Sequence, residues 1–429
     1  MQDLLTRGAV AVSATKSRGI YPQCSEHVQP MPPEFLLSQL NGPSAEGAGT
    51  ALSDARMAGS PADHRPLHGL VFTADDAPQF SPNRSLFVAR DSLAARGIRF
   101  DYAFASSLRS MASSYVRNVV HRGQLRWDYV LMNGLALLRR TPKFAKAIRV
   151  FHALRRPVFM LWRESGAMIE KLGREFPADY PAFLLAFGPR VHHLAVSSYV
   201  ASDVLRIIPN STSAVPVYNC AHIPSDFRTG RAPAAKPLFV NLATVQPRKG
   251  PDLFVEAALR ACACNDEVEF EWYGGEAPPA LIQRIRARGF AERIRFPGRT
   301  DAVWPVLQRA SALFFTSRDE PLSKAVLEAM GMARTVVCFP SGGTPEAIAD
   351  TGFCVPAFDT SAAADRLLEI AQLPPEQRIN HAAQQRFDSL FTVDAYASRL
   401  AAVIRGVVEA NRGGASERPL EASTHEPSC

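Results

Sequence analysis

Short apolar runs alternate with longer amphipathic stretches from residue 67 to residue 390, in two successive series. An apolar run bounded by turn residues is typical of a buried strand, and the amphipathic stretches have the periodicity of helices. Strands that alternate with helices form βαβ units, whose strands pair in parallel. This alternation predicts an α/β protein with two Rossmann-like β/α/β domains.

The two series define the expected domains, an N-terminal one at 67–225 and a C-terminal one at 237–390. In the first, we expect strands at 68–76, 98–105, 127–133, 157–164, 192–198 and 213–219, and helices at 85–97 and 141–156. In the second, we expect strands at 237–244, 268–275, 293–298, 312–317, 334–340 and 352–356, and helices that begin near 250, 279, 302, 322, 345 and 360.

The remaining segments differ in composition from the two series. Residues 226–236 are polar, carry Gly and Pro, and are typical of a linker. Residues 391–412 form one further helical pattern, which we expect to return to the first domain. Residues 1–66 and 413–429 are rich in Pro, Gly and Ser without periodicity, so we expect disordered extensions at both ends.

The charge balance is basic, because Lys and Arg number 48 and Asp and Glu number 41, a formal net charge of +7. Such a surplus suits an anionic partner, and a lipid-linked or polysaccharide acceptor would qualify. The basic residues form no concentrated stripe with aromatic residues between them, so nucleic acid is not an expected partner.

The sequence also bears on location. No stretch approaches the roughly 20 apolar residues of a membrane span, and charged residues interrupt Met1 to Ile20. The seven cysteines are scattered and the closest pair has no neighbouring His, which argues against a disulfide framework or zinc site. We expect a cytoplasmic protein with small buried or idle thiols. Peripheral contact with the inner membrane surface stays open.

Motifs for common cofactors are missing. The sequence has no G-x-G-x-x-G after a strand, no G-x4-G-K-[ST] and no H-E-x-x-H. Nicotinamide, P-loop and metal chemistry therefore lack their usual residues, and we expect no cofactor and no metal site.

The segment from Ser311 to Ile348 has the most informative pattern. A buried strand leads to a loop with Glu320, and a helix with Glu328 inside an apolar run follows. In parallel sheets such a loop lies at the carboxyl ends of the strands, where ligands bind. Pro321 pre-sets the first helical turn, and the free N–H groups there suit a phosphate. A buried carboxylate such as Glu328 needs partners, which a ribose diol supplies.

The spacing Glu320-x7-Glu328, with ALFFTS before it and Gly342 to Glu346 (GGTPE) after it, resembles the donor-site signature of glycosyltransferase family 4. The resemblance is good from about residue 237 to 373 and only topological before that. It implies the GT-B fold, in which two Rossmann-like domains face a cleft, and sugar transfer with retention of configuration. It also implies that the donor is a nucleotide-diphospho-sugar, with Glu320 on the sugar hydroxyls and Glu328 on the ribose.

The resemblance implies further donor contacts. Lys249, with Arg248 beside it, matches the family's lysine on the donor diphosphate. Gly298 and Arg299 lie in a segment similar to the one that passes under the nucleotide base, where the glycine would allow close approach. The expected phosphate contacts at the helix start are Leu322, Ser323 and Lys324.

Two positions depart from the family pattern. Ala243 stands where many members have an arginine, and Arg163 stands where the family has a histidine near the acceptor, although Glu164 keeps the family's glutamate. A guanidinium cannot act as a base, so we expect Arg163 to bind a phosphate. The glycine-rich acceptor loop is also absent, and Asn83 and Arg84 are the candidates to meet the acceptor in its place.

These observations predict a hexosyltransferase-type enzyme that moves a sugar to a hydroxyl of a glycan, lipid-linked sugar or polysaccharide precursor. The expected catalytic residues are Glu320, Lys249 and Arg163. A non-catalytic GT-B-like carbohydrate-binding or partner protein is an alternative because of Ala243 and Arg163, and a nucleotide-sugar epimerase is a weaker one. Donor sugar, base, linkage and oligomeric state are not specified by the sequence.

Overall fold

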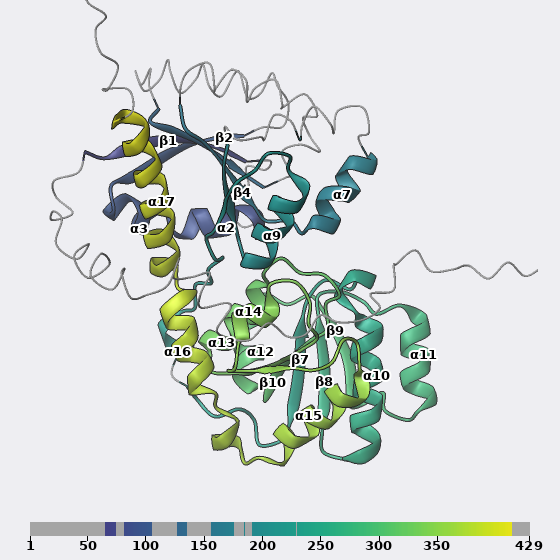
Figure 1. Cartoon of the computed structure of the whole chain (residues 1–429). Helices are drawn as coiled ribbons and strands as arrows, with labels where there is room; N and C mark the ends of the chain where they lie inside the picture. Colours follow the sequence, from purple (N-terminus) through teal and green to yellow (C-terminus); the bar gives the residue numbers. More distant parts are fainter. Residues whose placement is uncertain are drawn as a thin grey trace, which may run out of the picture. The chain divides into compact units, whose positions relative to one another are not determined.

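The computed structural model describes residues 65–73, 81–104, 127–134, 156–175, 184, 191–228 and 230–413. All of them belong to one compact unit, His64–Cys429, which contains two parallel six-stranded sheets with helices packed around them (Figure 1). The predicted α/β class is therefore confirmed. Of the predicted helix at 141–156, residues 141–155 lie outside the described residues, as do residues 1–64 and 414–429 of the two predicted extensions.

The first sheet has the strand order β2-β1-β3-β4-β5-β6, and all its pairs are parallel. Residues of β3 and β4 are buried throughout, which explains why the sequence shows unbroken apolar runs there. The strands are β1 (Leu67–Thr73), β2 (Ile98–Phe104), β3 (Tyr129–Asn133), β4 (Val158–Trp162), β5 (Val191–Ala195) and β6 (Ala214–Pro216).

Helices around the first sheet are α2 (Ser81–Val88), α3 (Arg90–Ala95), α7 (Gly166–Glu175) and α9 (Ser198–Ile207). The single helix predicted at 85–97 is wrong in detail. Helical structure begins earlier, at Ser81, and is interrupted at Ala89, whose φ of −87° and ψ of 1° are not helical. A proline is tolerated in a first helical turn, so Pro82 is compatible with the earlier start.

The second sheet has the order β12-β11-β10-β7-β8-β9 and is also parallel. An aromatic cluster packs beneath it, in which Phe254 stacks on Phe314 and meets Trp272 edge-on. The strands are β7 (Leu238–Leu242), β8 (Glu269–Tyr273), β9 (Ile294–Gly298), β10 (Ala312–Phe315), β11 (Thr335–Cys338) and β12 (Phe353–Cys354). The helices are α10 (Pro251–Cys264), α11 (Pro279–Ala287), α12 (Val303–Arg309), α13 (Lys324–Gly331), α14 (Thr344–Ile348) and α15 (Thr360–Gln372).

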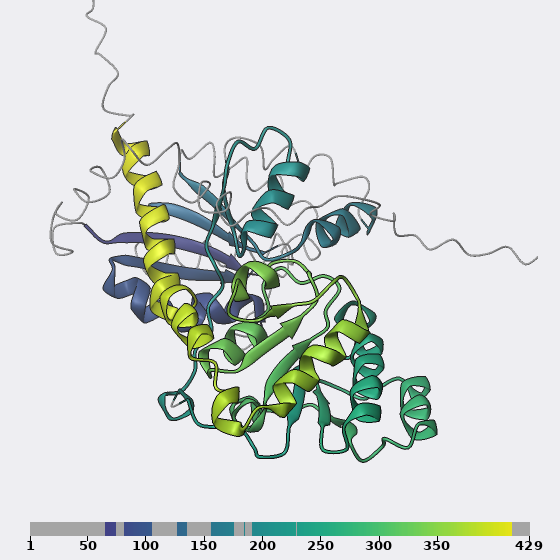
Figure 2. The same cartoon turned by 60° about the horizontal axis from the view of Figure 1, so that its bottom comes forward.

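The last two helices are α16 (His381–Leu390) and α17 (Val393–Gly413). α17 lies beside α3 of the first sheet, as both cartoon views show (Figures 1 and 2). Arg405 of α17 donates a 2.8 Å hydrogen bond to the carbonyl of Arg96, and Arg412 pairs with Asp128 at 2.6 Å. The C-terminal helix therefore contacts the half of the chain that contains β1.

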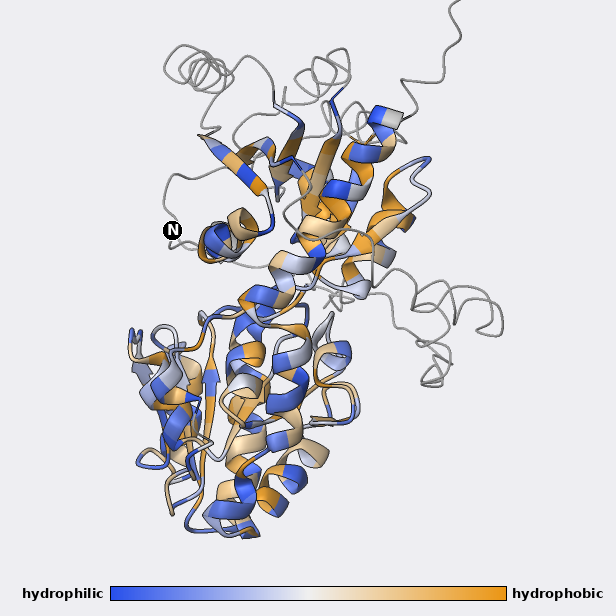
Figure 3. Cartoon of the chain, turned by 90° about the vertical axis from the view of Figure 1, so that its left-hand side faces the viewer, coloured by the Kyte–Doolittle hydropathy of each residue, from blue (hydrophilic) through white to orange (hydrophobic). Residues whose placement is uncertain are grey.

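The helices alternate between hydrophobic and hydrophilic residues along their length (Figure 3). This pattern places an apolar side against a sheet and a polar side toward solvent. Among the described residues, no helix combines the length and the apolar character needed to cross a membrane.

Buried Arg334 generates the first prediction. Its guanidinium, 1% exposed as a residue, donates to the carbonyls of Leu307 and Gln308 in the last turn of α12, each at 2.9 Å. Burial lowers the pKa of Arg334 to about 10, so it remains charged at neutral pH. We expect Arg334→Met to remove the hydrogen bonds from the guanidinium to these buried carbonyls and to lower the free energy of unfolding by about 2–4 kcal/mol.

Denaturant unfolding measures this loss. Arg260→Met is the matched control, because Arg260 is half exposed and pairs with Glu256 on the surface of α10. That pair is worth about 0.5 kcal/mol or less. Equal midpoints for the two variants would contradict the role of Arg334.

Candidate functional site

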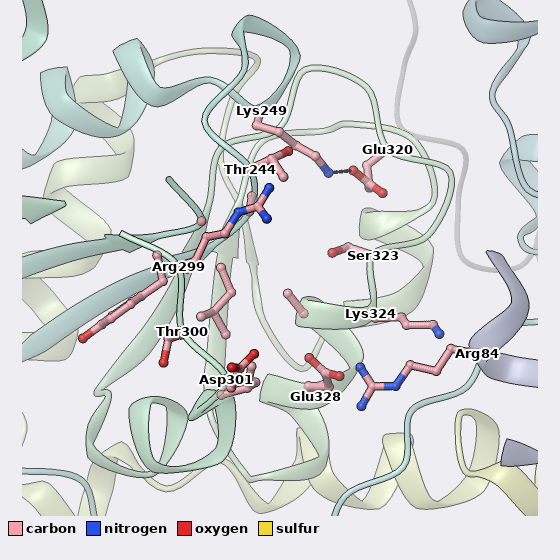
Figure 4. A pocket seen from close by; sticks show the side chains of 16 residues that line it. Arg84, Thr244, Lys249, Arg299, Thr300, Asp301, Glu320, Ser323, Lys324 and Glu328 are labelled. Carbon is pink, nitrogen blue, oxygen red and sulfur yellow. Dashed lines mark hydrogen bonds and ion pairs between the residues drawn. The ribbon is translucent and has the colours of Figure 1, made fainter. Parts of the chain in front are cut away.

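A cavity of about 410 Å³ opens at the carboxyl ends of β7 and β8, between the segment after β9 and the first turns of α13 (Figure 4). This volume lies in the range of small-molecule sites. The cavity is lined by Arg84, Leu242, Ala243, Thr244, Lys249, Tyr273, Gly274, Arg299, Thr300, Asp301, Val303, Glu320, Ser323, Lys324, Ala325 and Glu328.

Lys249 and Glu320 form an ion pair at one end of the cavity (Figure 4). Lys249 lies in a short 3₁₀ turn, η3 (Pro247–Lys249), that ends at Gly250 with φ +71°. The Lys249 and Glu320 side chains are only 12% and 14% exposed, and Arg248 adds a second contact to Glu320 at 3.2 Å. The structure thus brings Glu320 to two adjacent cations that are 71 and 72 residues away from it in the sequence.

Two glycines hold the backbone of Glu320 and Pro321 in place. The N–H of Gly343 donates to the carbonyl of Glu320 at 3.0 Å, and Gly342 has φ +58°. A Cβ atom at Gly342 would lie 1.8 Å from that carbonyl oxygen, and one at Gly343 would lie 2.2 Å from the carbonyl oxygen of Pro321. Only glycine fits these approaches, which explains the Gly-Gly pair beside Glu320.

Helix α13 begins at Lys324, two residues later than predicted, because Ser323 is still extended at φ −75° and ψ 128°. The side chain of Leu322 is buried in the apolar core and does not line the cavity, so the predicted phosphate contact at this residue would involve its backbone N–H. Ser323 and Lys324 do line the cavity, and the free N–H groups of the first helical turn begin there.

Glu328 lies one turn further along α13, faces the cavity and is 8% exposed (Figure 4). Burial raises the pKa of its carboxyl to about 7, against the opposing charges of Arg84 and Lys324. Burial likewise lowers the pKa of Lys324 to about 7, and the nearby charge of Arg163 lowers it further. Near neutral pH, Glu328 can therefore donate as well as accept a hydrogen bond.

The segment after β9 lines the wall opposite α13. Gly298 has φ +91°, and nothing lies within 4 Å of a Cβ built there, so its backbone conformation, not crowding within the chain, calls for glycine. Arg299 lines the cavity together with Thr300 and Asp301, and its predicted contact with the donor stays a prediction. Sequence reasoning missed Asp301, although its place just after the glycine of this segment was a usable signal.

Ala243 also lies in the cavity wall. Its carbonyl accepts a 2.7 Å hydrogen bond from Nε1 of Trp272, and a Cβ at Gly274 would lie 1.9 Å from the same oxygen. The backbone of residue 243 is thus fixed by neighbours in β8 and its extension. Nothing in this arrangement requires the arginine that the family resemblance suggests.

Arg163 follows the end of β4 and is not part of the cavity lining. Its Nε donates to Oδ1 of Asn133 at 2.7 Å, and its Nη1 lies 3.4 Å from Oδ1 of Asn219. The Glu164 carboxylate accepts from the backbone N–H of Arg163 at 3.0 Å. The guanidinium is therefore held by neutral amides.

Of the three residues predicted to meet the acceptor, one lines the cavity. Arg84 lies on α2 and reaches the cavity beside Lys324 and Glu328 (Figure 4). The side chain of Asn83 lies outside the described residues. Glu164 is half-buried beside Arg163 and is not among the lining residues.

Hydrogen bonds from segments that follow first-sheet strands reach the residues that flank Glu320. Ser165 Oγ donates to Oδ2 of Asp319 at 2.6 Å, and Ser197 Oγ donates to the carbonyl of Pro321 at 2.7 Å. The Glu346 carboxylate accepts from the N–H of Ser198 at 2.8 Å. Hydrogen bonds thus hold the residues on both sides of Glu320. Within the described ranges, no group of three or more His, Cys, Asp or Glu could hold a metal ion.

Comparison with known sequences finds similarity to glycosyltransferases over part of the chain. Residues 236–372 match the family Glycosyl transferases group 1. Over 190 residues, 41% of this chain and 40% of the relative, the sequence is 30% identical to the D-inositol 3-phosphate glycosyltransferase of Streptomyces avermitilis. It is 31% identical over 132 residues, 29% of this chain and 30% of the relative, to the enzyme of the same name from Mycobacteroides abscessus. The chain thus spans less than half the length of these relatives.

Solved structures extend the likeness over both sheets. Sucrose-phosphate synthase from Thermosynechococcus elongatus matches with a TM-score of 0.61, 15% identity, and coverage of 80% of this chain and 100% of that one. The Anabaena protein HepE, in complex with UDP and glucose, matches with a TM-score of 0.58, 16% identity, and coverage of 79% and 99%. The predicted GT-B-like fold is confirmed.

The raised pKa of Glu328 generates a second prediction. Between pH 4.5 and about 7, the folded protein keeps a proton that the unfolded chain releases, so this carboxyl lowers stability as pH rises. A pKa raised from 4.5 to about 7 corresponds to about 3 kcal/mol. The quantity to compare is the unfolding free energy of Glu328→Gln minus that of the parent. We expect this difference to be about 2–3 kcal/mol larger at pH 8 than at pH 5.

Urea unfolding of both proteins at the two pH values measures this difference. Glu369→Gln is the control, since Glu369 is exposed and pairs with Arg366 on the surface of α15. A Glu328→Gln variant whose relative stability is the same at both pH values would contradict the burial argument.

Proposed function

We propose that this protein transfers a sugar from a nucleotide-diphospho-sugar to a hydroxyl of its acceptor, as a retaining enzyme of glycosyltransferase family 4 that needs no metal ion. The observation that carries the proposal is the cavity itself. It has the Lys249–Glu320 pair at one end, the start of α13 in the middle, and buried Glu328 further along that helix. UDP in the complex of the structural neighbour HepE supports a nucleotide donor.

The donor's diphosphate would lie against Lys249, Arg248 and the N–H groups near Ser323. Cations and a helix start stabilise the negative charge that develops as the glycosidic bond breaks. Lys249 and Arg248 both contact Glu320 in the structure. When the diphosphate takes over these cations, the Glu320 carboxylate is released to accept hydrogen bonds from the sugar hydroxyls.

The nucleoside would occupy the other end. Glu328 would meet the ribose hydroxyls, which suits a carboxyl that both donates and accepts. The base would lie near Arg299 and Thr300, on the opposite wall of the cavity.

Arg84 and Lys324 support an anionic acceptor. Both face the cavity, and the pKa of Lys324 is lowered first by burial and then by charges that include Arg163 and Arg84. A phosphate on the acceptor would relieve this repulsion, as on a lipid-linked sugar. The Streptomyces and Mycobacteroides relatives are named for a phosphorylated acceptor. Such an enzyme would work in the cytoplasm, at or near the inner membrane surface.

Transfer would then proceed on one face of the sugar. The acceptor hydroxyl attacks the anomeric carbon from the side of the leaving diphosphate, whose oxygen takes the proton. Lys249 stabilises the leaving group, and Glu320 orients the sugar. Arg163 acts indirectly, since it lies outside the cavity and raises the positive potential at Lys324.

A thermal-shift screen against UDP-, GDP- and ADP-sugars tests the donor class, because a ligand that binds the folded protein raises its melting temperature, and at equal concentration a tighter ligand raises it more. We expect one of the three to stabilise the protein, and release of the nucleoside diphosphate to follow when a phosphorylated hydroxyl acceptor is added. Stabilisation without turnover on any acceptor would favour the non-catalytic alternative, and no stabilisation would overturn the proposal.

A third prediction concerns the leaving group. Lys249→Ala removes the cation at the diphosphate and should lower turnover by a factor on the order of 100. Arg318→Ala is the control, since Arg318 lies two residues before Glu320 in the loop after β10, is not among the residues that line the cavity, and pairs with Asp252 at 2.6 Å. Steady-state kinetics with and without EDTA complete the test. Activity that EDTA abolishes and Mn²⁺ restores would contradict a metal-free reaction.

A fourth prediction separates the two glutamates. Glu328→Ala should weaken binding of the nucleoside diphosphate without its sugar. Glu320→Ala should leave that binding intact and lower turnover, because its sugar contacts matter most at the transition state. Calorimetry with the nucleotide and kinetics with the full donor distinguish these effects. Equal, small effects of both substitutions would overturn the assignment.

A further inference from the structure

Two cysteines that are distant in sequence lie opposite each other at the edge of the second sheet. Strands β11 and β12 pair in parallel, and Cys338 is the register partner of Cys354. Register partners project from the same face of a sheet, and neighbouring strands are about 4.8 Å apart. This spacing lies within the roughly 4.4–6.8 Å between Cα atoms that a disulfide spans.

The two thiols differ in accessibility and in acidity. Cys338 is fully buried, whereas Cys354 is exposed on the edge strand. A hydrogen bond from the Cys338 thiol lowers the pKa of Cys354, and the same bond raises the pKa of Cys338. An exposed thiol with a lowered pKa is the reactive partner, and a buried neighbour is placed to resolve it.

We propose that Cys338 and Cys354 are a modification site, which forms a reversible disulfide by exchange with a small disulfide such as oxidised glutathione. The Cys354 thiolate attacks one sulfur of oxidised glutathione and releases one glutathione thiolate. The Cys338 thiol then loses its proton and attacks the Cys354 sulfur of the mixed disulfide, which releases the second glutathione. The two cysteines lose two electrons and two protons, and two reduced glutathione molecules carry them away.

The other cysteines of the described ranges lack such a partner in position. Cys262 and Cys264 are two residues apart on α10, and side chains at that spacing do not face each other on a helix. Cys220 is buried beyond the end of β6.

The pair is connected to the donor end of the cavity. β11 ends at Cys338, and Gly342 follows four residues later. Gly342 packs so closely on the backbone of Glu320 that a Cβ atom there would lie 1.8 Å from the Glu320 carbonyl oxygen. A shift of β11 that brings the two sulfurs into bonding distance would therefore move Gly342 and displace the backbone of Glu320. We expect oxidation to lower turnover severalfold. This consequence rests on the proposed function, whereas disulfide formation does not.

Mass spectrometry of the full chain after incubation with oxidised glutathione tests the pair directly. Both cysteines lie in the tryptic peptide Thr335–Arg366, which becomes two hydrogens lighter if they are joined. Cleavage after Glu346 then yields two peptides that remain linked until dithiothreitol is added.

Three variants assign the roles. Cys338→Ser should stop at the mixed disulfide on Cys354, Cys354→Ser should not react in this peptide, and the exposed control Cys264→Ser should behave as the parent. A parent protein that stops at the mixed disulfide, or that does not react at Cys354, would overturn the proposal. This readout needs no activity, so it is independent of the proposed function. An oxidised protein with unchanged turnover would overturn the link to Glu320 alone.

Discussion

Parallel pairing in both sheets is the constraint on which the rest of the structure depends. Because every strand runs in the same direction within its sheet, the loops that follow the strands gather at one edge. Lys249, Arg299 and Glu320 follow three different strands, and this edge brings them to one cavity. The crossover helices that parallel strands require also supply α13, whose first turns complete the cavity wall.

Glu320 depends on this arrangement more than any other site residue. Gly342 and Gly343 press on its backbone, while Ser165 and Ser197, in segments that follow first-sheet strands, hold the residues on either side of it. Its carboxylate balances Lys249 and Arg248. The loop is therefore fixed by contacts from both halves of the chain, which keeps the carboxylate in position until a stronger anion competes for the two cations.

The electrostatics of the cavity follow from burial as much as from the number of charges. Glu328 and Lys324 are one helical turn apart on α13, and burial moves both pKa values toward neutrality from opposite directions. A buried charge is costly without a partner. The Glu328 carboxyl and the Lys324 amine are therefore partly neutral at pH values where an exposed group would be charged. A ligand that brings hydroxyls and phosphates can restore both charges, which couples protonation to binding.

Local sequence pattern was enough to predict the α/β class and most strand positions, because apolar periodicity acts over a few residues. It also predicted the strand, loop and helix that carry Glu320 and Glu328, because Pro321 and the Gly-Gly pair are local signals. It did not place the break at Ala89 or the later start of α13, which depend on how the chain packs. The position of Arg163 between Asn133 and Asn219 and the Cys338–Cys354 pair were decided by tertiary structure alone. Their partners come from segments distant in sequence, and only the register of strands and the packing of loops determine which distant residues meet.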